Sequence, residues 1–295
     1  ELLTGSLLPS SITDCVFENN HAGGNVGAVS AKNLTITNTH FLNNSAGGRG
    51  GAFSGARTVI EGCTFIGNRA LSSAAISGVA DVKNSVFIGN EVTGEGAGIL
   101  SDFAGTEPSD GGELINCLFA NNRSAAGPAI APLRSRFDTI IGGLQGFAWV
   151  ENCTFVGNES AAGYGLFDSE EVCGLYIENS LFWDNGPLLL TERRTRYSVR
   201  NSIVDGEIVE QEPINSSSYC GGLIVDIIEN GVTADPMFVD PENGNYRLAE
   251  GSPAIDAGLS QNAPEVDLDG NPRPAGEGID IGAYEFDSGP TPDAA

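Results

Sequence analysis

The 295-residue sequence lacks several features that would assign a function at once. No apolar run reaches 18 residues, which argues against a transmembrane helix. No Cys-x-x-Cys pair occurs, so the common cysteine-based metal motifs are excluded. Only two histidines are present, His21 and His40, and neither belongs to a Ser-His-Asp or Cys-His arrangement.

Basic residues are also scarce. The chain carries 14 Lys and Arg against 39 Asp and Glu, which gives a net charge of −25. Such a charge argues against binding to nucleic acid or to anionic membrane surfaces, and it suits a soluble extracellular protein. Because the chain opens at Glu1 without Met or a signal peptide, we expect a processed or trimmed secreted protein.

What the sequence does contain is one pattern repeated seven times: a small residue, any residue, Phe, two further residues and Asn. Its clearest copy is 39–44, and successive Phe residues lie 24, 24, 22, 32, 36 and 27 residues apart. A period in the low twenties is typical of a solenoid. The seven phenylalanines are Phe17, Phe41, Phe65, Phe87, Phe119, Phe155 and Phe182.

Each Phe is preceded by an alternating run, of which Leu34-Thr35-Ile36-Thr37 is typical. Alternation with a period of two indicates a half-buried strand. A second short strand lies further along each repeat, as in Gly27-Ala28-Val29 and Gly51-Ala52-Phe53. It is rich in Gly and Ala because successive coils lie only about 4.8 Å apart. The pattern predicts an all-β fold: a single-stranded right-handed parallel β-helix of eight to nine coils, with two or three short strands per coil and an irregular C-terminal cap.

Identical positions in successive coils superpose, so we expect an interior Phe stack and a ladder of Asn amides, with each ladder Asn at positive φ. Four cysteines occupy one inward corner of the repeat and are expected as buried thiols, with Cys117 and Cys153 close enough to touch. Cys173 and Cys220 lie outside the repeat register and are the better disulfide candidates.

The stretch Gly50-Gly51-Ala52-Phe53, paired with the Phe-x-x-Asn pattern, resembles the repeats of the chlamydial polymorphic outer-membrane proteins and related bacterial β-helix surface proteins. The resemblance covers about residues 10–205. It implies a fold but no particular chemistry, because a β-helix carries lyases, hydrolases and adhesins alike.

The final block includes Asp235-Pro236-Met237-Phe238 and Gly251-Ser252-Pro253-Ala254-Ile255-Asp256. It is similar to the C-terminal segment of bacterial proteins with a choice-of-anchor Q domain, which implies export and an end-cap role. We therefore expect an N-terminal cap at 1–10, repeats at 11–204, C-terminal coils and cap at 205–286, and a linker at 287–295.

Within that block, Asp267, Asp269 and Asn271 resemble the start of a calcium-binding loop. The bidentate Glu that such a loop needs twelve positions along is missing, so an Asx-rich turn is the alternative. The sequence predicts no other cofactor.

Four consecutive coils carry an insertion at the same turn. Between the second strand and the next aliphatic strand position, six or seven residues suffice in the early coils, whereas the later gaps are 15, 20, 11 and 10. Insertions that recur at one place in a repeat mark one face, often the binding face. The candidate ligand-binding residues on these loops are Asp102, Asp110, Arg134, Arg136, Asp138, Glu170, Glu171, Arg193, Arg194 and Arg196.

Arginines flanked by carboxylates suit a uronate or sulfated sugar, although salt bridges between the loops are an alternative. We predict a secreted or cell-surface anchored protein of bacterial type with a structural, adhesive or glycan-binding role. Its expected partner is a polysaccharide or another surface protein. One alternative is a polysaccharide lyase or glycoside hydrolase acting on acidic polysaccharide, although the repeat strands show no cluster of paired carboxylates. Another is end-to-end self-association through the apolar residues 1–10.

Overall fold

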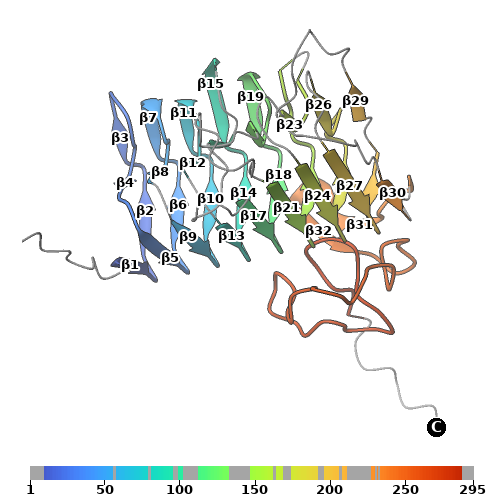
Figure 1. Ribbon diagram of the computed structural model, residues 1–295. Coiled ribbons are helices and arrows are strands. Elements are labelled where there is room, and N and C mark those ends of the chain that lie inside the picture. The colour runs from blue at the N-terminus through green and yellow to red at the C-terminus, as the bar shows by residue number, and fades with distance from the viewer. Residues whose placement is uncertain are drawn as a thin grey trace, which may run out of the picture.

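The computed structural model shows a parallel β-solenoid whose strands stack side by side along one axis (Figure 1). The structure describes residues 10–55, 58–78, 81–95, 99–101, 112–132, 147–161, 164–168, 174–191, 196–205, 208–210, 227–229, 231 and 233–287. Among them the only helical element is one 3-10 turn, η1 (Pro241–Asn243). The predicted all-β parallel architecture is confirmed.

Sheet A holds the strand that precedes each Phe, with every neighbouring pair parallel and in register. Its inward residues are aliphatic, such as Ile36, Ile60 and Val82, and they are fully buried. Its strands are β1 (Ser10–Thr13), β5 (Leu34–Thr37), β9 (Val59–Glu61), β13 (Asp81–Lys83), β17 (Gly112–Ile115), β21 (Phe147–Glu151), β24 (Gly174–Glu178), β27 (Arg196–Arg200) and β30 (Ile227–Glu229).

Sheet B holds the Phe strands and supplies the centre of the core. The seven Phe rings stack face to face, with neighbouring centroids 4.5 to 5.1 Å apart, and all but Phe17 are buried. This confirms the predicted interior stack. The strands are β2 (Val16–Glu18), β6 (His40–Leu42), β10 (Thr64–Ile66), β14 (Val86–Ile88), β18 (Leu118–Ala120), β22 (Thr154–Val156), β25 (Leu181–Trp183) and β28 (Ile203–Val204).

The Asn ladder is present, but the backbone prediction attached to it is wrong. Asn90, for example, donates from its backbone N–H and from Nδ2 to Oδ1 of Asn122, at 3.0 and 2.9 Å, and from Nδ2 to the carbonyl of Phe65. Positive φ belongs to the residue before the ladder position, as at Asn43 (53°) and Gly89 (61°). Asn and Gly take up that conformation readily, whereas the ladder Asn is selected for its amide.

A strand follows each ladder Asn in the first five coils, and the sequence pattern missed it. These strands form sheet C, so the early coils have four strands instead of two or three. Their sequences are short, polar and rich in small residues, and they become strands by pairing with the coils on either side. They are β3 (His21–Ala22), β7 (Ser45–Arg49), β11 (Arg69–Ser72), β15 (Glu91–Glu95) and β19 (Arg123–Ala126).

Sheets D and E form the remaining side, and a hydrogen bond from the Leu100 N–H to the Ile130 carbonyl (2.8 Å) joins them. Sheet D contains β4 (Val29–Ser30), β8 (Phe53–Ser54), β12 (Ile76–Ser77) and β16 (Leu100–Ser101). Sheet E contains β20 (Ala131–Pro132), β23 (Phe167–Asp168), β26 (Leu189–Thr191) and β29 (Ile208–Glu210).

Among the described residues, sheet A has nine strands and sheet B has eight, and each coil contributes at most one strand to each sheet. Sheets A and B continue into later layers, but sheet C stops after β19 and one further bridge between Arg123 and Glu159. The later layers therefore lack one of the four sides among the residues that the structure describes.

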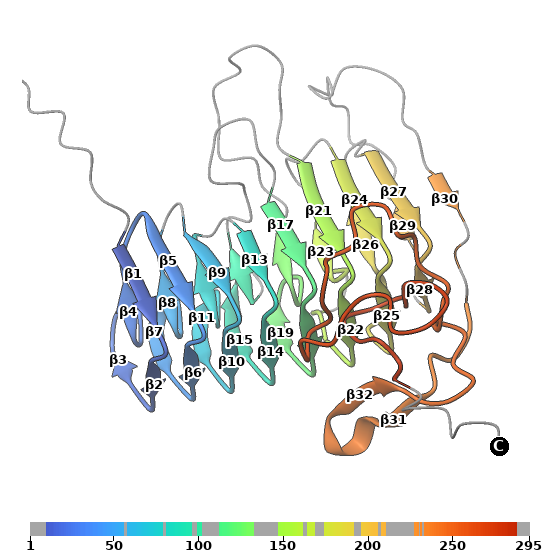
Figure 2. The same ribbon diagram turned by 90° about the horizontal axis from the view of Figure 1, so that it is seen from below.

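Residues 233–287, here called the C-terminal block, are irregular apart from η1 and the antiparallel pair β31 (Phe238–Asp240) and β32 (Asn245–Leu248). Figure 2 shows the block lying across β22, β25 and β28. Its apolar side chains, Tyr246, Ala283 and Tyr284 among them, pack against outward residues of sheet B such as Leu118 and Val156. The contacts that the structure describes thus place the block along the side of the solenoid. The resemblance had implied a cap at its end.

Candidate functional site

Most of the loop residues predicted to bind a ligand lie outside the described residues. Arg196 is the first residue of β27, but the structure does not describe its side chain. The disulfide candidates Cys173 and Cys220 also lie outside, as do residues 1–9 of the predicted N-terminal cap, whereas Ser10 begins β1. The other loop candidates that fall outside are Asp102, Asp110, Arg134, Arg136, Asp138, Glu170, Glu171, Arg193 and Arg194.

The ends of the four insertions are nevertheless described, and they share one corner of the solenoid. Each insertion leaves from a strand of sheets D or E and re-enters at a strand of sheet A: β16 to β17, β20 to β21, β23 to β24, and β26 to β27. The surface beside this corner that the structure describes is the outer face of sheet A.

Two columns of outward side chains run along that face, and they change from coil to coil. One column reads Lys83, Ile115, Glu151, Glu178 and Arg200 in direct register. The parallel column reads Asp81, Glu113, Trp149, Tyr176 and Ser198. Aromatic, acidic and basic side chains are thus brought together from strands more than twenty residues apart in the chain.

An aromatic pair stands at the centre. The Trp149 indole and the Tyr176 ring stack with centroids 4.4 Å apart and an interplanar angle of 15°. Trp149 is 48% exposed, an unusual position for the largest apolar side chain on a repeat protein of low aromatic content. One face of the indole is covered by Tyr176, so its exposed part can accept a flat apolar ligand surface.

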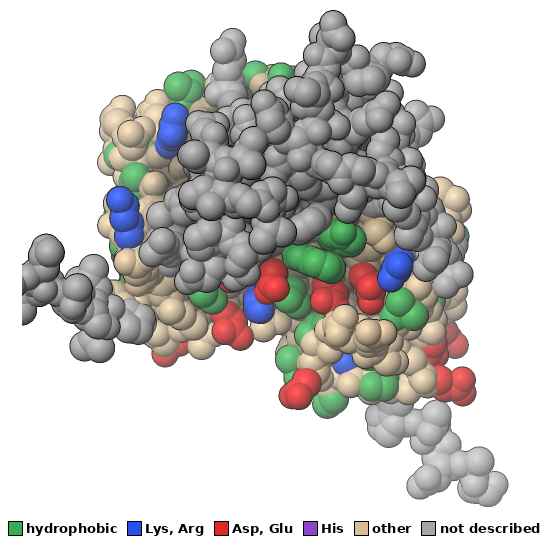
Figure 3. Space-filling model, viewed as in Figure 1, with side chains coloured by type: hydrophobic (Ala, Val, Ile, Leu, Met, Phe, Trp, Pro, Cys, Tyr) green, Lys and Arg blue, Asp and Glu red, His purple; other side chains and the backbone are tan. Residues whose placement is uncertain are grey.

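Three carboxylates surround the pair. Glu113 lies beside Trp149 on β17 and forms a half-exposed salt bridge with Lys83 (3.0 Å). Glu151 and Glu178 are direct register partners on β21 and β24. Figure 3 shows hydrophobic and acidic side chains gathered over these strands, just above the C-terminal block. We call Glu113, Trp149, Glu151, Tyr176 and Glu178 the sheet A site.

Burial raises the pKa of Glu151 to about 7, and the neighbouring carboxylates of Glu178 and Glu113 act in the same direction, against Lys83 and Arg273. Burial also raises the pKa of Glu178, against an opposing effect of Arg200. Among the described residues, Oε1 of Glu151 is buried without a hydrogen-bond partner. The site therefore contains a carboxyl group that exchanges a proton near neutral pH and has unused hydrogen-bonding capacity.

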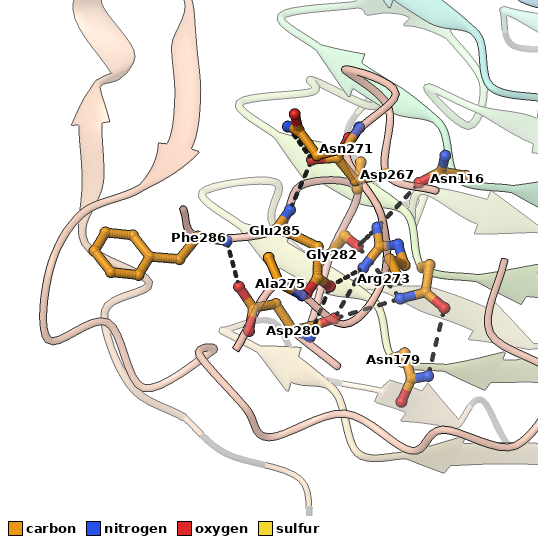
Figure 4. Close-up of polar contacts among 12 residues, drawn as sticks. Asn116, Asn179, Asp267, Asn271, Arg273, Ala275, Asp280, Gly282, Glu285 and Phe286 are labelled. Carbon is orange, nitrogen blue, oxygen red and sulfur yellow. Dashed lines mark hydrogen bonds and ion pairs between the residues drawn. The ribbon is translucent and has the colours of Figure 1, made fainter. Parts of the chain in front are cut away.

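The C-terminal block borders this site through a buried polar network (Figure 4). Nη1 of Arg273 donates to Oε1 of Glu285 (2.6 Å), and Nη2 donates to Oδ1 of Asn116 (3.1 Å) and to the Gly282 carbonyl. Both charged side chains are fully buried. Asn116 is one of the positive-φ turn residues at the corner of sheets A and B, so the network fixes the block to the solenoid.

Further turn asparagines also hold the block. Asn179 both accepts from the Leu259 N–H (2.7 Å) and donates to its carbonyl (2.9 Å). Nδ2 of Asn201 donates to the Ala257 carbonyl (3.1 Å). Burial raises the pKa of Asp280 to about 6, and this carboxylate accepts from the backbone N–H groups of Asp256 and Phe286.

The residues of the predicted calcium loop form an Asx turn. The carboxylate of Asp267 accepts hydrogen bonds from the backbone N–H groups of Asp269, Asn271 and Glu285 and from Nδ2 of Asn271. Asp269 forms a bidentate pair with Arg247. These carboxylate oxygens therefore already have donors, and calcium binding here stays a prediction. Among the described residues, no three His, Cys, Asp or Glu side chains are grouped to hold a metal ion.

The inward corner contains the four cysteines that the repeat placed there. The Cys117 N–H donates to Sγ of Cys153 (3.4 Å), so these two side chains do meet, and all four described cysteines are free. Burial raises the pKa of Cys63 to about 11 and that of Cys153 well above its usual value. Such thiols are protonated and unreactive at neutral pH.

Reasoning from the sequence missed Glu113, Trp149, Glu151, Tyr176 and Glu178 as one cluster. The prediction concerned carboxylates close together within one strand, whereas Glu151 and Glu178 are brought together across coils. A signal was present: Glu151 and Glu178 directly precede the turn residues Asn152 and Asn179. Aligning the coils on that turn would have shown the column.

Comparison with known protein families gives no match for this chain, and comparison with curated proteins gives no significant match. Within the part of the chain that the structure describes, no helix is long and apolar enough to span a membrane.

Proposed function

We propose that the protein is a secreted or cell-surface β-solenoid that binds a polysaccharide along the outer face of sheet A. The observation that carries the proposal is the exposed Trp149, stacked on Tyr176 and flanked by carboxylates. A pyranose ring presents an apolar C–H face that packs on an indole, while its hydroxyl groups donate hydrogen bonds to carboxylates.

The repeat geometry supports an extended ligand. Neighbouring strands of a sheet are about 4.8 Å apart, close to the length of one sugar unit in an extended glycan. A glycan lying along the solenoid axis would meet one new outward residue per coil: Ile115, then Glu151, then Glu178. The variation along the column would then distinguish successive sugars.

Binding of the protein to a panel of immobilised polysaccharides tests this proposal. We expect retention on at least one polysaccharide and a loss of at least tenfold in affinity for Trp149→Ala. Tyr164→Ala is the matched control, because Tyr164 is 38% exposed and lies outside the sheet A site. Failure to bind any polysaccharide, or equal binding by Trp149→Ala, would contradict the proposal.

The Glu151 and Glu178 pair favours a second candidate function, hydrolysis of a glycosidic bond. Retaining glycosidases use two carboxyl groups about 5–5.5 Å apart, and these residues sit at paired positions on adjacent strands about 4.8 Å apart. Glu151, with the pKa of about 7, would protonate the leaving oxygen, and Glu178 would attack the anomeric carbon. Water would then release the sugar, with Glu151 taking up its proton.

The release of reducing ends separates the two candidates. A hydrolase should generate them from a bound polysaccharide, and both Glu151→Gln and Glu178→Gln should lower the rate at least a hundredfold. Binding without release of reducing ends would rule out the hydrolase and support the binding function.

A further inference from the structure

The charge of the sheet A site selects among glycans. Three carboxyl groups lie next to the aromatic pair. Glu113 is the register partner of Trp149 on β17, and Glu151 and Glu178 lie two residues beyond Trp149 and Tyr176 on the same strands. A uronate or sulfate placed on the aromatic pair would be repelled by whichever of these groups are ionised, at a surface where partial burial weakens screening.

Among the described side chains of the two columns, the cations are Lys83 and Arg200, at the two ends. Arg273 of the C-terminal block also acts on Glu151. Lys83 lies two strands before Glu151, in a salt bridge with Glu113, and Arg200 lies one strand beyond Glu178. Between them the described side chains of the two columns are acidic, aromatic and aliphatic. A bound group that donates hydrogen bonds and carries positive charge would complement this surface.

We propose that the ligand of the sheet A site is a glycan with free amino groups, whose ammonium groups lie against Glu151 and Glu178 while a sugar ring packs on Trp149. This inference rests on the proposed function and specifies its ligand. An amino sugar combines the apolar ring face, the hydroxyl groups and the positive charge that the site complements. An ammonium group near an indole gains a further cation–π attraction.

A basic peptide shares the charge but not the flat ring. It would contact the carboxylates and make little use of the exposed part of the indole beyond cation–π contact. The amino sugar accounts for both halves of the site, so a peptide is kept as an outcome of the test.

The proposal has a consequence for pH dependence. The groups that affect Glu151 are Glu178 and Glu113 on the same sheet, Lys83 on β13, and Arg273 of the C-terminal block. A bound ammonium group favours the ionised form of Glu151, so binding is linked to proton loss from this carboxyl group. Affinity should fall at low pH as the carboxylates are protonated, and at high pH as the ligand's amino groups lose their charge.

Calorimetric titration of the whole chain with four hexasaccharides tests the proposal. Three are β-1,4-linked: the glucosamine oligomer, its fully N-acetylated form and the neutral glucose oligomer. The fourth, as the acidic sugar, is an α-1,4-linked oligogalacturonate of equal length. Hexalysine is the fifth ligand. We expect the glucosamine oligomer to bind at least tenfold more tightly than the other four near pH 6.5. High salt should weaken this binding.

Two sets of variants localise the effect. Glu151→Gln/Glu178→Gln should lower the affinity for the glucosamine oligomer at least tenfold and flatten the acid limb of its pH profile. The control Glu91→Gln/Glu159→Gln removes the same charge from the sheet C face, where these residues pair with Arg69 and Arg123. It should change the affinity less than twofold, which separates the site from the general attraction of a chain of charge −25.

Several results would overturn the inference, and they are distinguishable from failure of the proposed function. Equal binding of the N-acetylated or neutral oligomer would refute the amino-group requirement and leave glycan binding intact. Tighter binding of the oligogalacturonate would refute the charge argument. Hexalysine binding as tightly as the glucosamine oligomer, with no effect of Trp149→Ala, would show that the site selects charge alone. No binding of any oligosaccharide would remove the proposed function as well.

Discussion

The two sides of sheet A obey different rules. The inward positions keep one chemical character throughout, as Ile36, Ile60 and Val82 show, because identical side chains superpose and pack. The outward positions of the same strands change from Lys83 to Glu151 to Arg200. The comparison teaches that the repeat encodes the fold, and that departures from the repeat on the outer face encode what the protein contacts.

The outer face of sheet B adds a third case. Its outward residues Leu118, Val156 and Leu181 are buried in the later coils, where the C-terminal block covers them. In the first coil the corresponding Val16 is 60% exposed. Burial of an outward position on this sheet therefore depends on whether the C-terminal block covers it.

Disrupting the stack of inward phenylalanines should have the largest effect on stability. Phe119→Ala removes a fully buried ring between Phe87 (4.5 Å) and Phe155 (4.9 Å). We expect the free energy of unfolding in urea to fall by about 4 kcal/mol, the usual cost of Phe→Ala in a core. On the outer face, Trp149→Ala should cost less than about 1 kcal/mol. Equal losses for the two variants would contradict the comparison.

The C-terminal block should depend on its buried ion pair rather than its exposed one. Arg273→Ala leaves Glu285 buried without its cation, so we expect a loss of about 3 kcal/mol and faster proteolysis within residues 233–287. Arg247→Ala breaks the exposed pair with Asp269 and should cost at most about 1 kcal/mol. Urea unfolding and limited proteolysis measure both. An equal cost for the two variants would show that the buried network does not hold the block.

Two adjacent turn residues, Asn43 and Asn44, extend the comparison of inward and outward positions to single residues. Asn44→Ala removes the amide that binds Asn68, Asn20 and the Phe17 carbonyl, and should cost about 2 kcal/mol. Asn43→Gly keeps positive φ available and should change stability by less than about 0.5 kcal/mol, as Gly67 and Gly89 occupy the same position in later coils. Thermal or urea unfolding measures both losses. A larger loss for Asn43→Gly than for Asn44→Ala would show that the ladder is assigned to the wrong residue.

The smallest expected effect is the dependence of stability on pH through Glu151, on the outer face of sheet A. Because the folded pKa of Glu151 is raised to about 7, the folded protein binds this proton more tightly than the unfolded chain does. This contribution to stability is therefore lost as pH rises from about 4.5 through about 7. Glu151→Gln should be more stable than the wild type by about 1 kcal/mol at pH 8, after a discount for solvent screening, and nearly equal at pH 4.5. A constant difference across this range would contradict the raised pKa.

The interior of this protein could be predicted from the sequence because every coil repeats the same packing problem. Phe87 and Asn90 follow from spacing alone, and the structure places both in the core. The position of the C-terminal block could not be predicted, because its contacts join residues as distant as Asn116 and Arg273. No repeat relates these two segments.

The sheet A site was hidden for a different reason. Glu151 and Glu178 are neighbours in space but 27 residues apart, and insertions of unequal length shift the register of the outward residues. Sheet C was missed because strands such as β7 (Ser45–Arg49) show no apolar alternation. Their pairing with neighbouring coils defines them, and this information is absent from any single repeat.

Solvent access to Trp149 during ligand binding tests the central claim most directly. The chain has two tryptophans, and Trp183 packs against the C-terminal block, so Trp183→Phe leaves Trp149 as the only indole reporter. We predict that saturation with the glucosamine oligomer at least halves acrylamide quenching of the Trp149 fluorescence. Unchanged quenching while calorimetry shows the ligand bound would mean that the ligand binds elsewhere, and the assignment of function to the outer face of sheet A would be wrong.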